Sequence, residues 1–151
     1  MPASLAQFRL DDQVAVITGG ARGIGRATAE LFVAAGARVV ILDRDGEEAA
    51  KAAKEIGAAE AQALDVTDQA AVEGSFADLA ARMGRIDVLV NNAGASIRKP
   101  TIDLPIEDWD TVVAVNMTAV FLCSRAAAKP MIASGRGGAI VNLGSIMSFS
   151  G

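Results

Sequence analysis

The stretch Thr18-Gly19-Gly20-Ala21-Arg22-Gly23-Ile24-Gly25 follows the apolar run of residues 14–17 and opens a helical pattern that ends at Gly36. A strand, a glycine-rich turn and a helix in this order are the context in which a glycine motif is informative. The N-terminus of the helix leaves free N–H groups and carries partial positive charge, so a phosphate can bind there. Glycines are required because a Cβ would block the tight turn and hold the backbone away from the ligand.

The spacing of the glycines separates this motif from two related ones. Glycines at positions 19, 23 and 25 give G-x-x-x-G-x-G instead of G-x-G-x-x-G. Gly20 and Gly25 have the separation of a Walker-type phosphate loop, but Arg26-Ala27 occupy the positions where that loop requires Lys-Ser/Thr. A Walker-type loop is therefore excluded.

Composition limits the class of protein. The 151 residues are 52% hydrophobic and 21% charged, which indicates one globular domain with an apolar core. The net charge of -4 gives no indication of nucleic acid or an anionic membrane as a partner. The sequence contains no His, which excludes a His-based catalytic triad, and we expect no metal site.

Three further features bear on the cellular compartment and on membrane association. Cys123 is the only cysteine, so no disulfide forms within the chain and a cytoplasmic location is expected. Residues 1–12 have no apolar core of signal-peptide length. The longest apolar stretch, residues 112–123, is interrupted by Asn116 and is too short to span a bilayer, so no membrane partner is expected.

Apolar runs and helix start and stop signals predict strands that alternate with helices five times. The strands are expected at residues 14–18, 38–43, 59–64, 86–90 and 139–143, and the third is weak because alanine has low β-propensity. The helices are expected from the glycine turn to Gly36, from Asp45 to Gly57, from Thr67 or Asp68 to Gly84, and from Pro105 to about Ser134, with an interruption near Asn116 and a bend at Pro130. Such alternation predicts a parallel sheet with helices on both faces.

Side-chain spacing adds detail to three of these helices. The first is expected to place on one face Ile24, Thr28, Leu31, Phe32 and Ala35. The third carries an apolar stripe of Val72, Phe76, Leu79 and Met83. Asp45 and Glu48 have the spacing of a capping box at the start of the second.

Asp43 is the first of several polar residues that end predicted strands. It lies 18 residues after Gly25, where a carboxylate can accept hydrogen bonds from adenosine ribose hydroxyls and repel a 2′-phosphate. Asp-Arg-Asp-Gly is also good turn chemistry, but the preceding glycine turn favours the ribose interpretation. Arg22 and Arg44 could each meet a phosphate instead. We give the carboxylate more weight and expect NAD as the cofactor, with NADP as the alternative.

The remaining polar residues each have a functional and a structural interpretation. Asp65-Val66 ends the third strand, where it could also belong to a helix N-cap region. Asn91 and Asn92 could contact a ligand or tie neighbouring strands together. Asn116 interrupts an apolar helix, where an amide is costly unless it is hydrogen-bonded. Ser145 follows the fifth strand at the edge where open α/β sheets bind ligands, although a loop serine is the alternative.

Together these residues resemble the short-chain dehydrogenase/reductase family. The matching motifs occur in the order and at the spacings of the family: residues 18–25, Asp65-Val66, Asn91-Asn92-Ala93-Gly94, Asn116 and residues 140–145. The resemblance implies a Rossmann-type doubly wound α/β fold with a parallel sheet of order 3-2-1-4-5. Residues 1–151 would then be an NAD(P)-binding domain that is truncated after strand five.

The resemblance also implies roles for single residues. The pyrophosphate side of the dinucleotide would be held by Gly19, Arg22, Gly23, Ile24 and Gly25. The adenosine side would be held by Asp43, Arg44, Asp65 and Val66, and the nicotinamide ribose side would be lined by Asn92, Ala93 and Gly94. Asn116 would position a proton-relay water, and Ser145 would polarise the carbonyl or hydroxyl group of the substrate.

The implied activity is hydride transfer between a nicotinamide and a small alcohol or carbonyl substrate: a polyol, a sugar acid or a 3-oxoacyl compound. Members of the family use a Tyr as general acid/base, with a following Lys that lowers its pKa, and these 151 residues contain no Tyr. We therefore expect no turnover by this stretch alone.

Truncation after strand five also has structural consequences. Strand five would be an exposed sheet edge, and the long helix would expose an apolar face. A non-catalytic NAD-binding module and an inactive remnant are the alternatives, and a full-length chain is expected to form a homo-oligomer.

Overall fold

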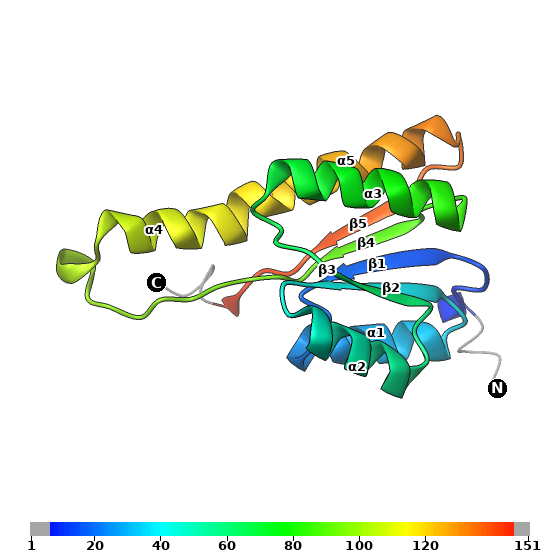
Figure 1. Ribbon diagram of the computed structural model, residues 1–151, viewed down its shortest axis with the longest axis horizontal. Helices are drawn as coiled ribbons and strands as arrows, with labels where there is room; N and C mark the ends of the chain where they lie inside the picture. The colour runs from blue at the N-terminus through cyan, green and yellow to red at the C-terminus, as the bar shows by residue number, and fades with distance from the viewer. Residues whose placement is uncertain (1–6, 147–151) are drawn as a thin grey trace.

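A computed structural model describes residues 7–146 and contains a parallel five-stranded sheet between two layers of helices (Figure 1). The strands are β1 (Val14–Thr18), β2 (Arg38–Asp43), β3 (Glu60–Ala63), β4 (Val88–Asn91) and β5 (Ala139–Asn142). Their order across the sheet is β3-β2-β1-β4-β5, and all four neighbouring pairs are parallel. The predicted fold class and strand order are confirmed.

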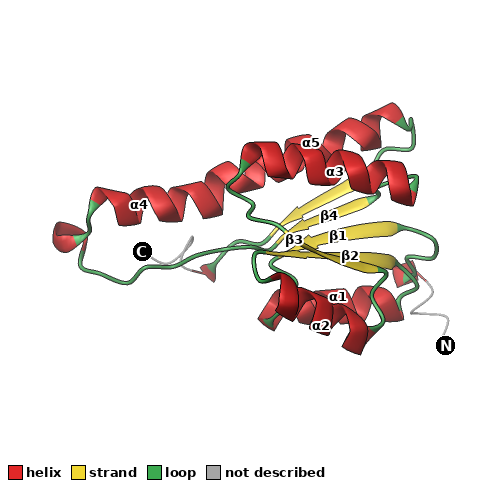
Figure 2. Ribbon diagram, in the orientation of Figure 1, coloured by secondary structure: helices red, strands yellow, loops and turns green. Residues whose placement is uncertain are grey.

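The helices divide between the two faces of the sheet (Figure 2). They are α1 (Gly23–Ala34), α2 (Gly46–Ile56), α3 (Gln69–Met83), α4 (Ile106–Val113) and α5 (Ala119–Ala133), with a 3₁₀ turn at Thr101–Asp103 and a π-helix, η3, at Ala114–Thr118. Helices α1 and α2 cover one face, and α3 and α5 cover the other. The 3₁₀ turn was not expected from the sequence.

Alternating side chains of the strands supply the two halves of the core. Val14 and Val16 belong to the cluster that includes residues of α3 and α5, whereas Ala15 and Ile17 belong to the cluster that includes residues of α1 and α2. Because successive strand residues point to opposite faces, an uninterrupted apolar strand is the pattern that a sheet covered on both sides requires. The predicted stripe of α3 is confirmed: Phe76 and Leu79 are buried, and Met83 packs against the same cluster.

The predicted apolar face of α1 is wrong in part: Phe32 packs against the core, but two other large members of the face do not. Ile24 and Leu31 are 68% and 69% exposed, and the buried residues of α1 are Gly25 and Ala29. The helix turns its smallest side chains to the sheet, since a Cβ built on Gly25 would meet the Gly19 carbonyl oxygen and the Asn92 amide. Close approach of the glycine turn to the sheet therefore outweighs burial of the larger apolar residues.

The predicted interruption of the long α-helix near Asn116 is confirmed, and it takes the form of a π-helix between α4 and α5. Asn116 lies within the π-helix η3, so the local disturbance is a widened turn and not a break. Pro130 lies inside α5.

The whole segment, residues 106–133, has 28 residues with a mean hydropathy of 1.5 in its most apolar window, so it is long and apolar enough to cross a membrane by length and composition alone. This finding corrects the expectation that the apolar stretch is too short to span a bilayer. One such helix is weak support for a membrane span, because the core helix of a soluble protein passes the same test. In this structure α5 contributes Leu122, Ala127 and Met131 to the core.

Two apolar surfaces remain exposed in the described part of the chain, as expected. Along the long helix, Trp109, Met117 and Phe121 are 55%, 68% and 59% exposed. All four residues of β5, which is a terminal strand of the sheet, are exposed.

Candidate functional site

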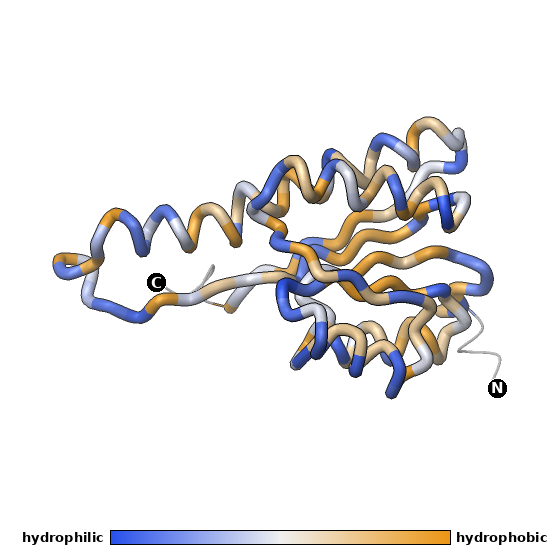
Figure 3. The backbone as a smooth tube through the Cα atoms, in the orientation of Figure 1, coloured by the Kyte–Doolittle hydropathy of each residue, from blue (hydrophilic) through white to orange (hydrophobic). Residues whose placement is uncertain are grey.

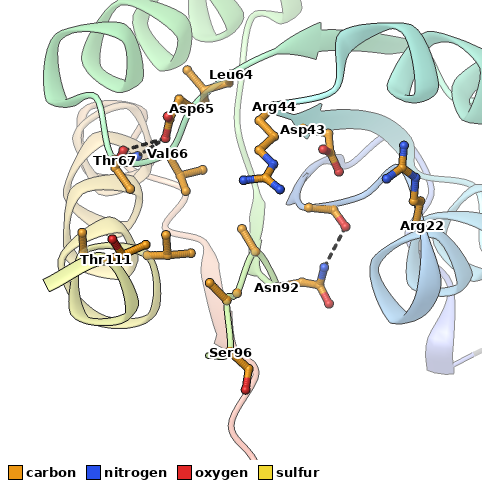
Figure 4. Close-up of a pocket in the computed structure, with 16 residues that line it drawn as sticks. Arg22, Asp43, Arg44, Leu64, Asp65, Val66, Thr67, Asn92, Ser96 and Thr111 are labelled. Carbon is orange, nitrogen blue, oxygen red and sulfur yellow. Dashed lines mark hydrogen bonds between the residues drawn. The ribbon is translucent and has the colours of Figure 1, made fainter. Parts of the chain in front are cut away.

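A cavity of about 700 Å³ lies at the carboxyl ends of the strands, where the turns after β1, β2, β3 and β4 meet (Figure 4). Thr111, Ala114 and Val115 of α4 and η3 also line it, and Figure 4 shows Thr111 next to Val66 and Thr67 of the turn after β3. The cavity lies where the chain order reverses, because β1 has β2 on one side and β4 on the other. Open α/β sheets bind their ligands in this crevice.

Nine of the twelve residues predicted to contact a cofactor line the cavity. They are Gly19, Arg22, Asp43, Arg44, Asp65, Val66, Asn92, Ala93 and Gly94. Gly23, Ile24 and Gly25 are not among its lining residues and form the first turn of α1. Figure 4 shows the Arg44 guanidinium projecting into the cavity between Asp65 and Asn92.

The glycine turn has the geometry that a bound phosphate requires. Gly23 has a φ of 54°, and an added Cβ there would have no neighbour within 4 Å, so this glycine is needed for backbone conformation and faces open space. No side chain caps the N-terminus of α1. The helix therefore presents its first N–H groups without a side-chain acceptor, next to a space that an anion could occupy.

Thr18 and Asn92 hold the glycine turn against the end of β4. The Thr18 Oγ1 accepts hydrogen bonds from the backbone N–H groups of Asn92 and Ala93, both at 3.1 Å. The Asn92 Nδ2 donates to the carbonyl oxygens of Thr18 at 3.0 Å and Gly19 at 2.8 Å. This geometry confirms the strand-tying interpretation of Asn92, whose side chain can have a ligand-binding role only through its remaining oxygen.

Asn91 ties the neighbouring elements on the other side of β4. Its Nδ2 donates to the Asn142 Oδ1 of β5 at 2.8 Å and to the Ser124 Oγ of α5 at 3.0 Å. The strand-tying interpretation is thus confirmed for both consecutive amides.

Asp43 joins the glycine turn to the turn after β2. Its Oδ2 accepts from the Ala21 N–H at 3.2 Å, and its Oδ1 accepts from the Asp45 N–H at 3.1 Å. The predicted capping box is therefore only half right: the Asp45 side chain accepts from the Glu48 N–H at 3.1 Å, but Asp43, and not Glu48, provides the reciprocal bond. A carboxylate offers about four acceptor positions, so Asp43 keeps capacity for a ribose hydroxyl.

Asp65 lies in a local turn on the opposite side of the cavity. It accepts hydrogen bonds from the Thr67 hydroxyl at 2.7 Å and the Thr67 N–H at 2.9 Å. These two bonds, the hydroxyl bond first, hold the pKa of Asp65 below its ordinary value of 3.8. Asp68 caps α3 by accepting from the Ala71 N–H at 3.0 Å, so Asp65 is not the helix cap.

Neither predicted catalytic residue lines the cavity. The Asn116 amide is satisfied by one residue, since its Oδ1 accepts from the Ala95 N–H at 2.9 Å and its Nδ2 donates to the Ala95 carbonyl at 2.8 Å. Asn116 therefore fixes the segment after β4, which does line the cavity, to the π-helix. Ser145 is exposed three residues after the end of β5.

Sequence reasoning missed the lining residues Leu64, Thr67, Ala95, Ser96, Thr111, Ala114 and Val115. Those from the strand ends could have been found by extending each motif by a few residues. Thr111, Ala114 and Val115 have the i, i+3, i+4 spacing of one helix face, but only the tertiary fold shows that this face closes the cavity. In the described residues, 7–146, no group of three His, Cys, Asp or Glu side chains could hold a metal ion.

The fold, the glycine turn and the position of the cavity define a Rossmann-type α/β protein. The chain belongs to the short chain dehydrogenase family, whose model matches residues 13–151. Members of this family use NAD(P). The predicted resemblance is confirmed.

Several relatives that resemble this chain are dehydrogenases by name. The chain is 49% identical to sorbitol dehydrogenase of Cereibacter sphaeroides and 42% identical to D-threitol dehydrogenase of Mycolicibacterium smegmatis, each match covering 91% of this chain and 54% of the relative. A crystal structure of a short-chain type dehydrogenase/reductase from Mycobacterium marinum superposes with a TM-score of 0.91 at 32% identity, over 97% of this chain and 59% of that one. The chain thus spans about half the length of the curated relatives that it matches.

Proposed function

We propose that residues 1–151 form the NAD-binding domain of an oxidoreductase that moves a hydride between nicotinamide and an alcohol or carbonyl group of a small polyol. The observation that carries this proposal is the cavity at the carboxyl edge of the sheet, which brings nine of the predicted cofactor residues together. When bound, the nicotinamide ring would supply the hydride acceptor or donor. The protein would bind and orient it and control proton movement at the substrate oxygen.

The described residues fit a dinucleotide in two parts. The uncapped N-terminus of α1 and the open space at Gly23 suit the pyrophosphate, which Gly19, Ile24 and Gly25 would flank with backbone groups. Further along the cavity, Asp65 and Val66 would line the adenine, and Asn92, Ala93 and Gly94 would line the nicotinamide ribose.

Asp43 supports NAD rather than NADP as the cofactor. Its two backbone hydrogen bonds fix the carboxylate between the glycine turn and the β2–α2 turn, at the end of β2. A fixed carboxylate there can accept from ribose hydroxyls and repels a 2′-phosphate. Arg44 projects into the same cavity and would lie beside the adenosine.

The substrate is proposed from the names of relatives and from two residues. The relatives include enzymes named for sorbitol, D-threitol and galactitol, which are polyols. Ser145 would donate a hydrogen bond to the substrate oxygen, and Asn116 would help to hold a proton-relay water. These 151 residues contain no Tyr to act as general acid/base, so we propose that they do not turn over substrate by themselves.

We also propose that the full-length protein is a cytoplasmic homo-oligomer. The exposed apolar residues Trp109, Met117 and Phe121 follow one another along the long helix and support a helix-mediated contact between copies. Cys123, the only cysteine, is a buried free thiol, which is compatible with a reducing compartment.

The cofactor proposal is tested by titrating the wild type and Asp43→Ala with NADH and with NADPH. Loss of hydrogen bonds from a charged acceptor should weaken NADH binding by roughly 10-fold or more, and NADPH binding should be affected less. Asp78→Asn removes a similar charge on α3, outside the cavity, and should change neither affinity. Tighter binding of NADPH than of NADH by the wild type would contradict the proposed preference and give Arg22 or Arg44 the dominant role.

A further inference from the structure

Arg22 and Asp45 form an ion pair at the outer edge of the cavity. The Arg22 Nη2 donates to the Asp45 Oδ2, and the two side chains are 67% and 41% exposed. Arg22 is the N-cap residue of α1, and Asp45 is the N-cap residue of α2. The pair therefore connects the glycine turn to the turn after β2, the same two segments that Asp43 joins from within (Figure 4 shows Arg22 beside Asp43).

Asp45 makes this ion pair and the helix cap with different oxygens. Its Oδ1 accepts from the Glu48 N–H at 3.1 Å, while its Oδ2 receives Arg22. Its own N–H donates to the Asp43 Oδ1 at 3.1 Å. Arg22 is consequently bound to a side chain that is itself fixed at two points, by a cap and by the carboxylate at the end of β2.

The charges near the end of β2 leave little attraction for an additional anion. Asp43 and Asp45 carry one negative charge each, and Arg22 and Arg44 carry one positive charge each, so the four side chains are together neutral. Asp65 adds a further negative charge at the opposite wall of the cavity. Of these two cations, Arg22 is the one held in an ion pair, so breaking that pair would make its guanidinium available to another anion.

We propose that Asp45 is a cofactor-specificity residue that acts by keeping Arg22 away from a 2′-phosphate on the adenosine ribose. This inference rests on the proposed NAD-binding function of the cavity. Asp43 disfavours the extra phosphate by direct repulsion, whereas Asp45 acts by holding the guanidinium of Arg22 in an ion pair. NADP would have to break the Arg22–Asp45 pair to gain the charge-assisted hydrogen bonds that Arg makes with phosphate.

The decisive variant is Asp45→Ser. Serine is a good N-cap residue, so it keeps an acceptor for the Glu48 N–H, but it has no charge and is too short to hold Arg22. Asp45→Asn is the second variant, which retains the shape and the cap. The matched control is Glu55→Gln. Glu55 of α2 forms another ion pair with Arg26 of α1, with an N···O distance of 2.7 Å, and neither residue lines the cavity. The substitution therefore removes a similar charge from a similar pair at a place where no cofactor is proposed to bind.

Dissociation constants for NADH and NADPH would be measured by fluorescence titration at low and at high ionic strength, after far-UV circular dichroism has established folding. Asp45→Ser should bind NADPH roughly 3- to 10-fold more tightly than the wild type. Its affinity for NADH should stay within about twofold of the wild-type value. The gain in NADPH affinity should shrink at about 0.5 M salt, because salt screens interactions between exposed charges. Asp45→Asn should shift NADPH affinity in the same direction. Glu55→Gln should match the wild type, and the double variant Arg22→Ala/Asp45→Ser should lose the gain.

The outcomes separate this inference from the function on which it rests. If the wild type and Asp45→Ser bind NADH equally well and NADPH affinity does not rise, Asp45 does not control specificity. A gain that persists in the double variant would overturn the role of Arg22. If the wild type binds neither dinucleotide, the proposed function fails and this inference fails with it.

Discussion

Replacing Thr18 by Val tests the connection between the glycine turn and β4. Thr18 is 2% exposed, and its Oγ1 is the acceptor for two backbone N–H groups, those of Asn92 and Ala93. Valine has nearly the same shape but no acceptor, so both N–H groups lose their partner. At about 1–3 kcal/mol for each of the two unsatisfied donors, the free energy of unfolding should fall by roughly 2–6 kcal/mol.

Thr18→Ser is the matched control because it keeps the hydroxyl and removes only a methyl group. Its expected cost is about 0.5–1.5 kcal/mol, as for other deletions of one buried methyl. Both variants would be compared with the wild type by urea denaturation followed by far-UV circular dichroism, with the slope of the transition checked for constancy. If Thr18→Val is no more destabilised than Thr18→Ser, the hydroxyl does not hold the turn and the structural account of this site is wrong.

Three further predictions follow from single features of the structure. Gly25→Ala should lower the free energy of unfolding by about 1–3 kcal/mol, because the added Cβ would meet the Gly19 carbonyl. Gly74→Ala in α3 is the control: open space surrounds Gly74, so the free energy of unfolding should stay the same or rise. Equal effects of the two substitutions in urea denaturation would contradict the close packing of α1. Hydrogen bonds lower the pKa of three carboxyl groups in the folded protein: Asp45 from 3.8 by the Glu48 N–H, Glu60 from 4.5 by Arg82, and Asp65 from 3.8 by Thr67. Each ionised carboxylate therefore stabilises the fold fully at a pH above its ordinary pKa. This stabilisation is lost as the pH falls through the lower pKa of the folded state. Urea denaturation from pH 6 to pH 2 should therefore show stability falling below about pH 4, and a flat profile would oppose this assignment. Burial raises the pKa of the Cys123 thiol to about 12, so a thiol reagent at pH 8 should label the urea-unfolded chain and spare the native one, and rapid native labelling would contradict the burial of α5.

Local signals in the sequence were sufficient for much of the fold. The caps at Asp45 and Asp68 and the glycine stops at Gly57 and Gly84 fall where their residue types predict, because each depends on contacts within one helical turn. Strand alternation was equally readable, because a strand covered on both faces is apolar throughout.

Features set by distant contacts were not readable from the sequence. Ile24 of α1 is exposed and Gly25 is buried, because close packing against the Asn92 side chain, which follows β4, decides which residues of the helix face the sheet. The reciprocal cap from Asp43 depends on the turn after β2. Thr111 and Val115 reach the cavity only because the long helix crosses the carboxyl edge of the sheet. For each of these residues, the deciding partner comes from another element.

The most direct test of the central claim is an NMR titration of the isotope-labelled protein with NAD. The account predicts that amide shifts concentrate at the glycine turn, residues 19–25, and at the cavity residues after β2, β3 and β4, with little change on β5. An absence of saturable shifts at millimolar NAD, or shifts confined to surfaces outside the cavity, would contradict the assignment of this cavity as a dinucleotide site.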